Sequence, residues 1–192
     1  ELEALVRKVD VTICTMTPRQ VVDLGLDYDS LRVLNPKLVY CVISPFGETG
    51  PMANVCADDG VVAAYAGVYG EQGGIDAPPV FVHLPLPSYG AAFLAASVIG
   101  AALYVREATG QGQKVGTSLY AGALAMQAGT LVSGPGVRSW VRDQGAHTGQ
   151  LGANPVYGLY QCSDDHWIMI ACGTEIFWNK LCIALDRVEW IE

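Results

Sequence analysis

KLVYCVIS, residues 37–44, is an apolar run in which polar and apolar side chains do not alternate. A strand that is covered on both faces of a parallel sheet has this pattern. A second run of the same kind, DVTIC, precedes it at residues 10–14. Between the runs, residues 19–24 and 28–34 carry apolar side chains at helical spacing, and Asn35-Pro36 ends the second helix. The order strand, helix, strand predicts a parallel α/β unit.

The residues that follow extend this pattern. SPFGETGP, residues 44–51, is a turn-rich loop at the carboxyl end of the predicted strand, where ligands of open α/β sheets bind. TGQGQ, residues 109–113, turns the chain into a further predicted strand, KVGTSL. Helices are predicted over residues 58–69, 88–106 and 119–132, with Ser88 as a candidate N-cap.

From residue 133 onwards, the composition of the chain and the order of its predicted elements change. Residues 133–154 are rich in Gly and polar residues, which predicts a linker. VYGLYQC and HWIMIAC then predict a hairpin, and residues 174–185 a helix with Phe177, Leu181 and Leu185 on one face. We therefore predict a large α/β domain over residues 1–132, a linker over 133–154, and the start of a small α+β domain over 155–192.

Composition excludes some function classes. The chain is 51% hydrophobic and carries a net charge of −8, which argues against a nucleic-acid partner. Residues 84–105 carry no charge and are long enough for a transmembrane helix, but their Ala, Gly and Ser content favours a helix packed inside a protein. We expect no membrane partner. The six cysteines form no CxxC pair, which favours buried free thiols in a reducing cytoplasm over zinc or disulfide sites.

The residues alone reveal little chemistry. Neither a dinucleotide fingerprint nor a phosphate loop is present, and the three histidines show no metal-ligand spacing. His83 lies five residues before Ser88, so it is either a dyad partner or a plain loop histidine. The adjacent Asp58 and Asp59 suit either acid–base work or helix capping. This pattern indicates a soluble α/β domain followed by an α+β piece.

Several segments, in order, resemble the class III CoA-transferase family, the carnitine and bile-acid-inducible type. The most specific are LGLDYDSLRVLNPKLVYCVISPFGETGP and the TGxGQxV turn; the others are DDGVVAAYAG, LGANPVYGLYQCSDDHWIMIACG and FWNKLCIAL. The resemblance implies a Rossmann-like parallel sheet in a large domain, a small α+β domain, and CoA bound between them. It also implies that this chain is the central part of a longer protein whose two copies interlock.

In that family an aspartate opens the long small-residue helix, 21 residues before the Thr of TGxGQ, and attacks the thioester. Counting back from Thr109 reaches Ser88. A carboxylate exchanges acyl groups through an anhydride and a CoA thioester, whereas a serine would form a less activated ester. Ser88 also lacks an evident base to activate it. Related racemases place their aspartate at Ser88 and their histidine near Asp58, so racemisation is disfavoured.

The resemblance implies CoA transfer between an acyl-CoA thioester and a carboxylic acid, with coenzyme A as substrate and no metal. Ser88 and Asp59 are the candidate catalytic residues, and Pro45, Phe46, Gly47 and Glu48 the candidate CoA-binding residues. The alternative is a non-catalytic subunit of a heteromeric CoA-transferase. Whether the chain is itself an enzyme stays open, as does the choice between a homodimer and a heterodimer with a paralogous subunit.

Overall fold

The structure, a computed structural model, describes residues 2–71, 78–127 and 156–191. The chain divides into two compact units, which are described separately. One comprises Glu1–Val68 and His83–Ala128, the other Tyr69–Val82 and Gly129–Glu192. The predicted linker over residues 133–154 lies outside the described residues, so the predicted domain limits stay a prediction.

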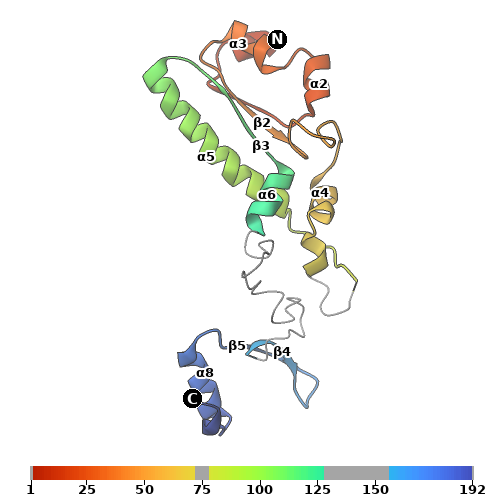
Figure 1. Ribbon diagram of the computed structural model, residues 1–192, viewed down its shortest axis with the longest axis vertical. Helices are drawn as coiled ribbons and strands as arrows, with labels where there is room; N and C mark the ends of the chain where they lie inside the picture. The colour runs from red at the N-terminus through yellow and green to blue at the C-terminus, as the bar shows by residue number, and fades with distance from the viewer. Residues whose placement is uncertain (1, 72–77, 128–155, 192) are drawn as a thin grey trace. The chain divides into compact units, whose positions relative to one another are not determined.

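A parallel sheet forms the centre of the first unit (Figure 1). Its strands lie in the order β1, β2, β3, with Ile13 opposite Cys41 and Cys41 opposite Val115. The middle strand is buried along almost all its length, as its apolar run predicts. The outer strand β1 departs from the prediction of burial on both faces, because Ile13 at the edge of the described sheet is 56% exposed. The strands span Val11–Cys14 (β1), Val39–Ser44 (β2) and Lys114–Ser118 (β3).

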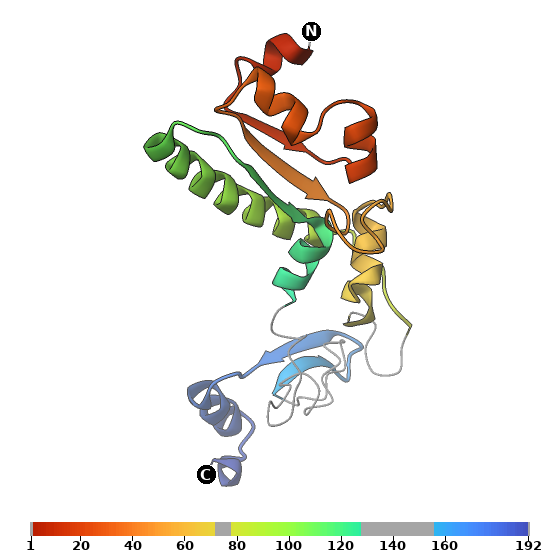
Figure 2. The same cartoon turned by 45° about the horizontal axis from the view of Figure 1, so that its top comes forward.

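Helices lie on both faces of this sheet, as Figures 1 and 2 show. On one face, Leu38, Tyr40 and Val42 of β2 pack in a core with residues from the N-terminal helices. On the other face runs the long helix α5. The N-terminal helices span Leu2–Val6 (α1), Pro18–Asp23 (α2) and Tyr28–Leu34 (α3).

Helix α5, Leu86–Thr109, begins two residues before the predicted helix and ends three after it. It packs closely on α6, Leu119–Met126, because Gly90 and Gly122 face each other at the crossing. By length and composition α5 could also cross a bilayer, and 22% of its apolar window is buried. Buried helices of soluble proteins pass the same test. The prediction of a helix packed inside the protein is right for one face only, since Phe93 and Tyr104 are exposed.

The TGQGQ turn is held by its glycines. Gly110 ends α5 in the left-handed region, at φ +70°, where glycine is favoured. Gly112 lies directly against the chain that enters β2, so that an added Cβ would stand 2.1 Å from the carbonyl oxygen of Leu38. Arg106 of α5 binds Asp10 at 2.9 Å, just before β1. The motif therefore fixes how α5 returns to the sheet.

Helix α4, Asp59–Tyr65, is shorter than the predicted helix over residues 58–69. Gly67 interrupts it at φ +82°, and a 3₁₀ turn, η1 (Val68–Glu71), follows. The predicted helix over residues 119–132 was too long, because α6 ends at Met126 with Gln127 as its C-cap; residues from 128 lie outside the described part.

The second unit contains the predicted hairpin and helix. The hairpin is antiparallel, with Leu159 opposite Met169. In the helix, the predicted apolar face is not buried within this chain: Phe177 and Leu185 are exposed, whereas Cys182 is fully buried. The elements span Tyr157–Gln161 (β4), Trp167–Ala171 (β5), Glu175–Ala184 (α8) and Val188–Trp190 (η2).

Candidate active site at the start of α5

Ser88 is the third residue of α5 and is partly buried. The prediction that it is the N-cap is wrong. The helix starts earlier, after Pro85, and no side chain of its own caps it. Proline suits the first turn of a helix because its φ is already helical and it has no N–H to satisfy. Pro85 and Pro87 therefore draw the helix start ahead of Ser88.

Asp59 supplies the missing cap from another helix. The backbone N–H of Ser88 donates to Asp59 Oδ2 at 2.8 Å. A carboxylate there is favourable, since the N-terminus of a helix carries unpaired N–H groups and partial positive charge. The start of α5 and the start of α4 are thus joined by one hydrogen bond across 29 residues.

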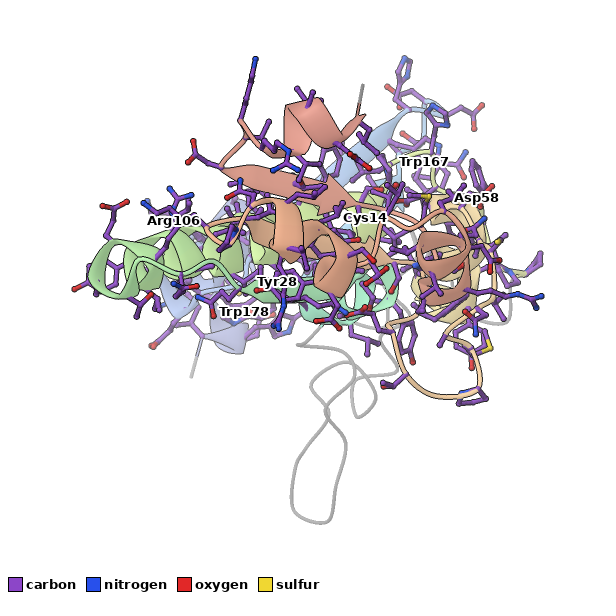
Figure 3. The ribbon with its side chains drawn as sticks, turned by 90° about the horizontal axis from the view of Figure 1, so that it is seen from above. Cys14, Tyr28, Asp58, Arg106, Trp167 and Trp178 are labelled. Carbon is purple, nitrogen blue, oxygen red and sulfur yellow. The ribbon has the colours of Figure 1, made fainter. Side chains whose placement is uncertain are left out.

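The neighbouring carboxylate has a separate task. Asp58 is the N-cap of α4, and its Oδ1 accepts from the N–H of Val61 at 2.9 Å. Figure 3 shows Asp58 and Arg106 at opposite sides of the first unit, so the site lies at the far end of α5 from the TGQGQ turn. The two adjacent aspartates therefore begin two different helices.

The loop after β2 holds the four predicted CoA-binding residues. Ser44 is buried, and its Oγ accepts from the N–H of Gly47, which lies at φ +99°. The carbonyl of Pro45 accepts from the N–H of Tyr120, at the start of α6. Glu48 pairs with Lys114 of β3. One of these interactions lies within the loop, and the other two fasten the loop to α6 and β3.

Phe46 joins the loop to α4. Its ring lies 5.3 Å from that of Tyr65 and 6.2 Å from that of Tyr120, and the two tyrosine rings are 5.6 Å apart. Tyr65 and Tyr120 were not predicted as site residues. The position of Tyr120, directly after a strand, was the available signal, because ligand sites gather at the carboxyl ends of parallel strands.

The structure thus brings Ser88 and Asp59 into contact, and it connects Phe46 to the other end of α4. Among the described residues, no hydrogen bond joins Ser88 to the loop of Pro45, Gly47 and Glu48 directly. His83 comes shortly before α5 and is exposed. No pair between His83 and Ser88 is seen in the described part of the chain.

Two features lie away from this site. A cavity of about 390 Å³ opens beside β1, lined by apolar residues that include Leu5, Ile13 and Leu31. Burial raises the pKa of the Cys41 thiol and, more strongly, that of the Tyr40 hydroxyl, whose proton is donated to the Leu26 carbonyl at 2.8 Å. No candidate site residue lines the cavity.

The cysteines follow the expectation in part. All six are free; Cys14, Cys41 and Cys182 are buried, whereas Cys56 is exposed. Within the ranges that the structure describes, no three His, Cys, Asp or Glu side chains gather as metal ligands do.

With this geometry established, the comparisons assign the family. The sequence profile of CoA-transferase family III matches residues 1–192. The chain belongs to CoA-transferase family III. This confirms the family resemblance and the α/β fold class.

Two family III relatives and one solved structure illustrate the similarity. Acetyl-CoA:oxalate CoA-transferase of Acetobacter aceti is 32% identical over 191 residues, which cover 96% of this chain and 47% of the relative. The succinyl-CoA–L-malate CoA-transferase alpha subunit of Chloroflexus aurantiacus is 29% identical, over 96% of this chain and 43% of its own. A CAIB/BAIF family protein from Brucella suis superposes with a TM-score of 0.73 at 28% identity, over 98% of this chain and 49% of its own. The chain spans about half the length of these family III proteins.

Proposed function

We propose that the protein carrying this chain transfers CoA between an acyl-CoA thioester and a carboxylic acid, in the cytoplasm. The observation that carries the proposal is the family III match over all 192 residues. The relative from Acetobacter aceti is named for this activity, with acetyl-CoA and oxalate as its reactants. That pair is therefore the first to test.

The proposed CoA site is the loop of Pro45, Phe46, Gly47 and Glu48. It is supported by the position of the loop at the carboxyl end of the middle strand. Gly47 adds space for a ligand, since it has no side chain and its φ of +99° disfavours one. The proposed assembly is a dimer of interlocked chains, with each site between a large and a small domain.

A second candidate function is a non-catalytic subunit that completes a heterodimer beside a paralogous chain. Ser88 supports it, because a hydroxyl cannot form the anhydride on which exchange depends. The relative named as an alpha subunit belongs to an enzyme with more than one kind of chain. The two functions predict different behaviour when the protein is purified alone.

The test incubates the complete native polypeptide with acetyl-CoA and isotope-labelled oxalate, and then with other dicarboxylic acids. We expect label to enter the CoA thioester fraction. If label enters only after a paralogous chain encoded nearby is added, the protein is the non-catalytic subunit. If neither preparation exchanges label with any acid, CoA transfer is the wrong function.

A further inference from the structure

The proposed reaction requires a carboxylate, and residue 88 does not provide one. Three carboxylates lie on the segments that build the candidate site. Glu48 is paired with Lys114, and Asp58 is occupied as the N-cap of α4. The third, Asp59, is hydrogen-bonded to the backbone of residue 88 itself. Of the carboxylates that the structure describes, only Asp59 forms a hydrogen bond with this residue.

We propose that Asp59 is the nucleophilic carboxylate of this protein, in place of the side chain that the family resemblance assigns to residue 88. This inference rests on the proposed CoA transfer. Figure 1 shows the start of α4 close to the start of α5. A nucleophile at residue 59 rather than residue 88 therefore lies at the start of α4 instead of the start of α5.

The geometry leaves Asp59 able to react. Its Oδ2 accepts the Ser88 N–H at 2.8 Å, whereas Oδ1 has no hydrogen bond within the described residues. The side chain is only partly buried, so a thioester can approach it. One oxygen is therefore held and oriented while the other is available for attack.

The same N–H suits the later steps. When Asp59 has become an acyl group, attack on its carbonyl carbon places negative charge on the oxygen that faces Ser88. A backbone N–H at about 2.7–3.1 Å from that oxygen is the arrangement that stabilises such an oxyanion. The 24-residue helix α5 contributes its positive end at the same point.

The steps balance without a further reactant. Asp59 Oδ1 attacks the thioester carbonyl carbon, and the C–S bond breaks. CoA leaves as thiolate, and a mixed anhydride of Asp59 and the acyl group remains. The thiolate then attacks the Asp59 carbonyl carbon and releases the first acid as carboxylate. The carboxylate of the second acid attacks the resulting aspartyl-CoA thioester, which forms a second mixed anhydride and releases the thiolate. The thiolate then attacks the acyl carbonyl carbon of the second acid, and the bond between that carbon and the Asp59 oxygen breaks. Asp59 returns as a free carboxylate, with no net gain or loss of protons or electrons.

Serine at position 88 fits this arrangement. An aspartate there would add a second negative charge on the residue whose backbone N–H binds Asp59, and nearby like charges oppose each other's ionisation. Serine removes that repulsion and still provides the backbone N–H. The substitution that removes one nucleophile thus favours the other.

The test compares Asp59→Asn with Asp58→Asn in the complete native polypeptide. Asparagine at 59 keeps a side-chain oxygen for the Ser88 N–H, and asparagine at 58 remains a good N-cap, so both variants should fold. Exchange between acetyl-CoA and labelled acid is measured for each, together with thermal unfolding. Hydroxylamine and borohydride then trap activated carboxylates in the wild type, and peptide mass spectrometry locates them.

We expect Asp59→Asn to lose exchange by about a thousandfold or more, as removal of a covalent nucleophile does. Asp58→Asn should keep wild-type exchange, and the trapped group should map to residue 59. Wild-type exchange in Asp59→Asn, or trapping on any other carboxylate, would overturn this inference while leaving CoA transfer intact. Absence of exchange in the wild type would overturn the proposed function, and this inference with it.

Discussion

Asp27 caps helix α3 with both of its carboxylate oxygens. Oδ2 accepts the Ser30 hydroxyl at 2.7 Å, and Oδ1 accepts the Ser30 N–H at 3.0 Å. These two bonds hold the pKa of Asp27 below its ordinary value, and the bond from the Ser30 hydroxyl has the larger effect. A carboxyl whose pKa falls on folding stabilises the fold above its unfolded pKa, and that contribution is lost as the pH drops through the folded pKa.

We therefore predict that Asp27→Ala costs about 1 kcal/mol of unfolding free energy at pH 7, as loss of an N-cap does. The penalty should shrink as the pH falls below about 4, the ordinary pKa of aspartate, and on through the lower pKa of the folded Asp27 carboxyl. Urea unfolding at pH 7 and pH 3 measures both values. Asp27→Asn serves as control, because it keeps an acceptor without a titrating group. An Asp27→Ala penalty that is equal at the two pH values would contradict the role of the charge.

For single residues, the sequence identified which residues belong to the candidate site better than it identified the contacts between them. Ser88 was found by counting from Thr109, and Asp59 was identified as either an acid–base residue or a cap. The bond between the two could not be predicted, because it spans 29 residues and leaves no local spacing to detect. Ser88 was misassigned as an N-cap since serine is a common cap, but two prolines start the helix earlier.

The crossing of α5 and α6 depends on two glycines without side chains. A Cβ on Gly90 would stand 2.2 Å from the carbonyl oxygen of Gly122, closer than packed atoms allow. Gly100 lies on the same helix with nothing within 4 Å of an added Cβ. The two positions therefore separate the effect of helix propensity from that of packing.

We predict that Gly90→Ala destabilises the first unit by about 1–3 kcal/mol, because the helices must move apart to accept the methyl group. Gly100→Ala should instead stabilise it by up to about 1 kcal/mol, since alanine favours the helix over glycine. Chemical denaturation followed by circular dichroism measures both variants. If both substitutions stabilise the first unit, or both destabilise it, the close crossing of α5 and α6 is wrong.

Among the elements, those whose limits depend on local sequence were predicted best. Helix α3 matches residues 28–34 because Asp27 and Asn35-Pro36 mark its ends. Helix α4 was predicted too long, because Gly67 was not interpreted as the glycine that ends the helix in the left-handed region. Burial of β1 was also overestimated, since an apolar run does not show whether a strand lies inside a sheet or at its edge.

Apolar side chains remain uncovered in this chain as a whole. In β5, Trp167, Ile168 and Met169 are each about half exposed. Large exposed apolar patches mark surfaces that contact other protein. The relatives are about twice as long as this chain, so the rest of such a protein, or a partner chain, can supply the cover.

We predict that the 192-residue chain, produced by itself, associates in solution. Light scattering over a concentration series should show a mass that rises with concentration, and Ile168→Lys should reduce the rise. The reason is that lysine at this exposed position adds charge to the apolar surface without altering the core. A monodisperse monomer at high concentration would contradict both this prediction and the interlocked assembly.

The middle strand of the sheet is completed late as the chain is synthesised. Val11 pairs with Val39, 28 positions further along, whereas Tyr40 pairs with Lys114, 74 positions further along. Ribosomes add about 5–20 residues per second, so those 74 residues take about 4–15 s. Through that interval β2 has one unpaired edge, which is a site for wrong pairing with other chains. A chaperone that covers this edge until α5 and the TGQGQ turn have brought in β3 should raise the yield of folded protein more than one that acts after release.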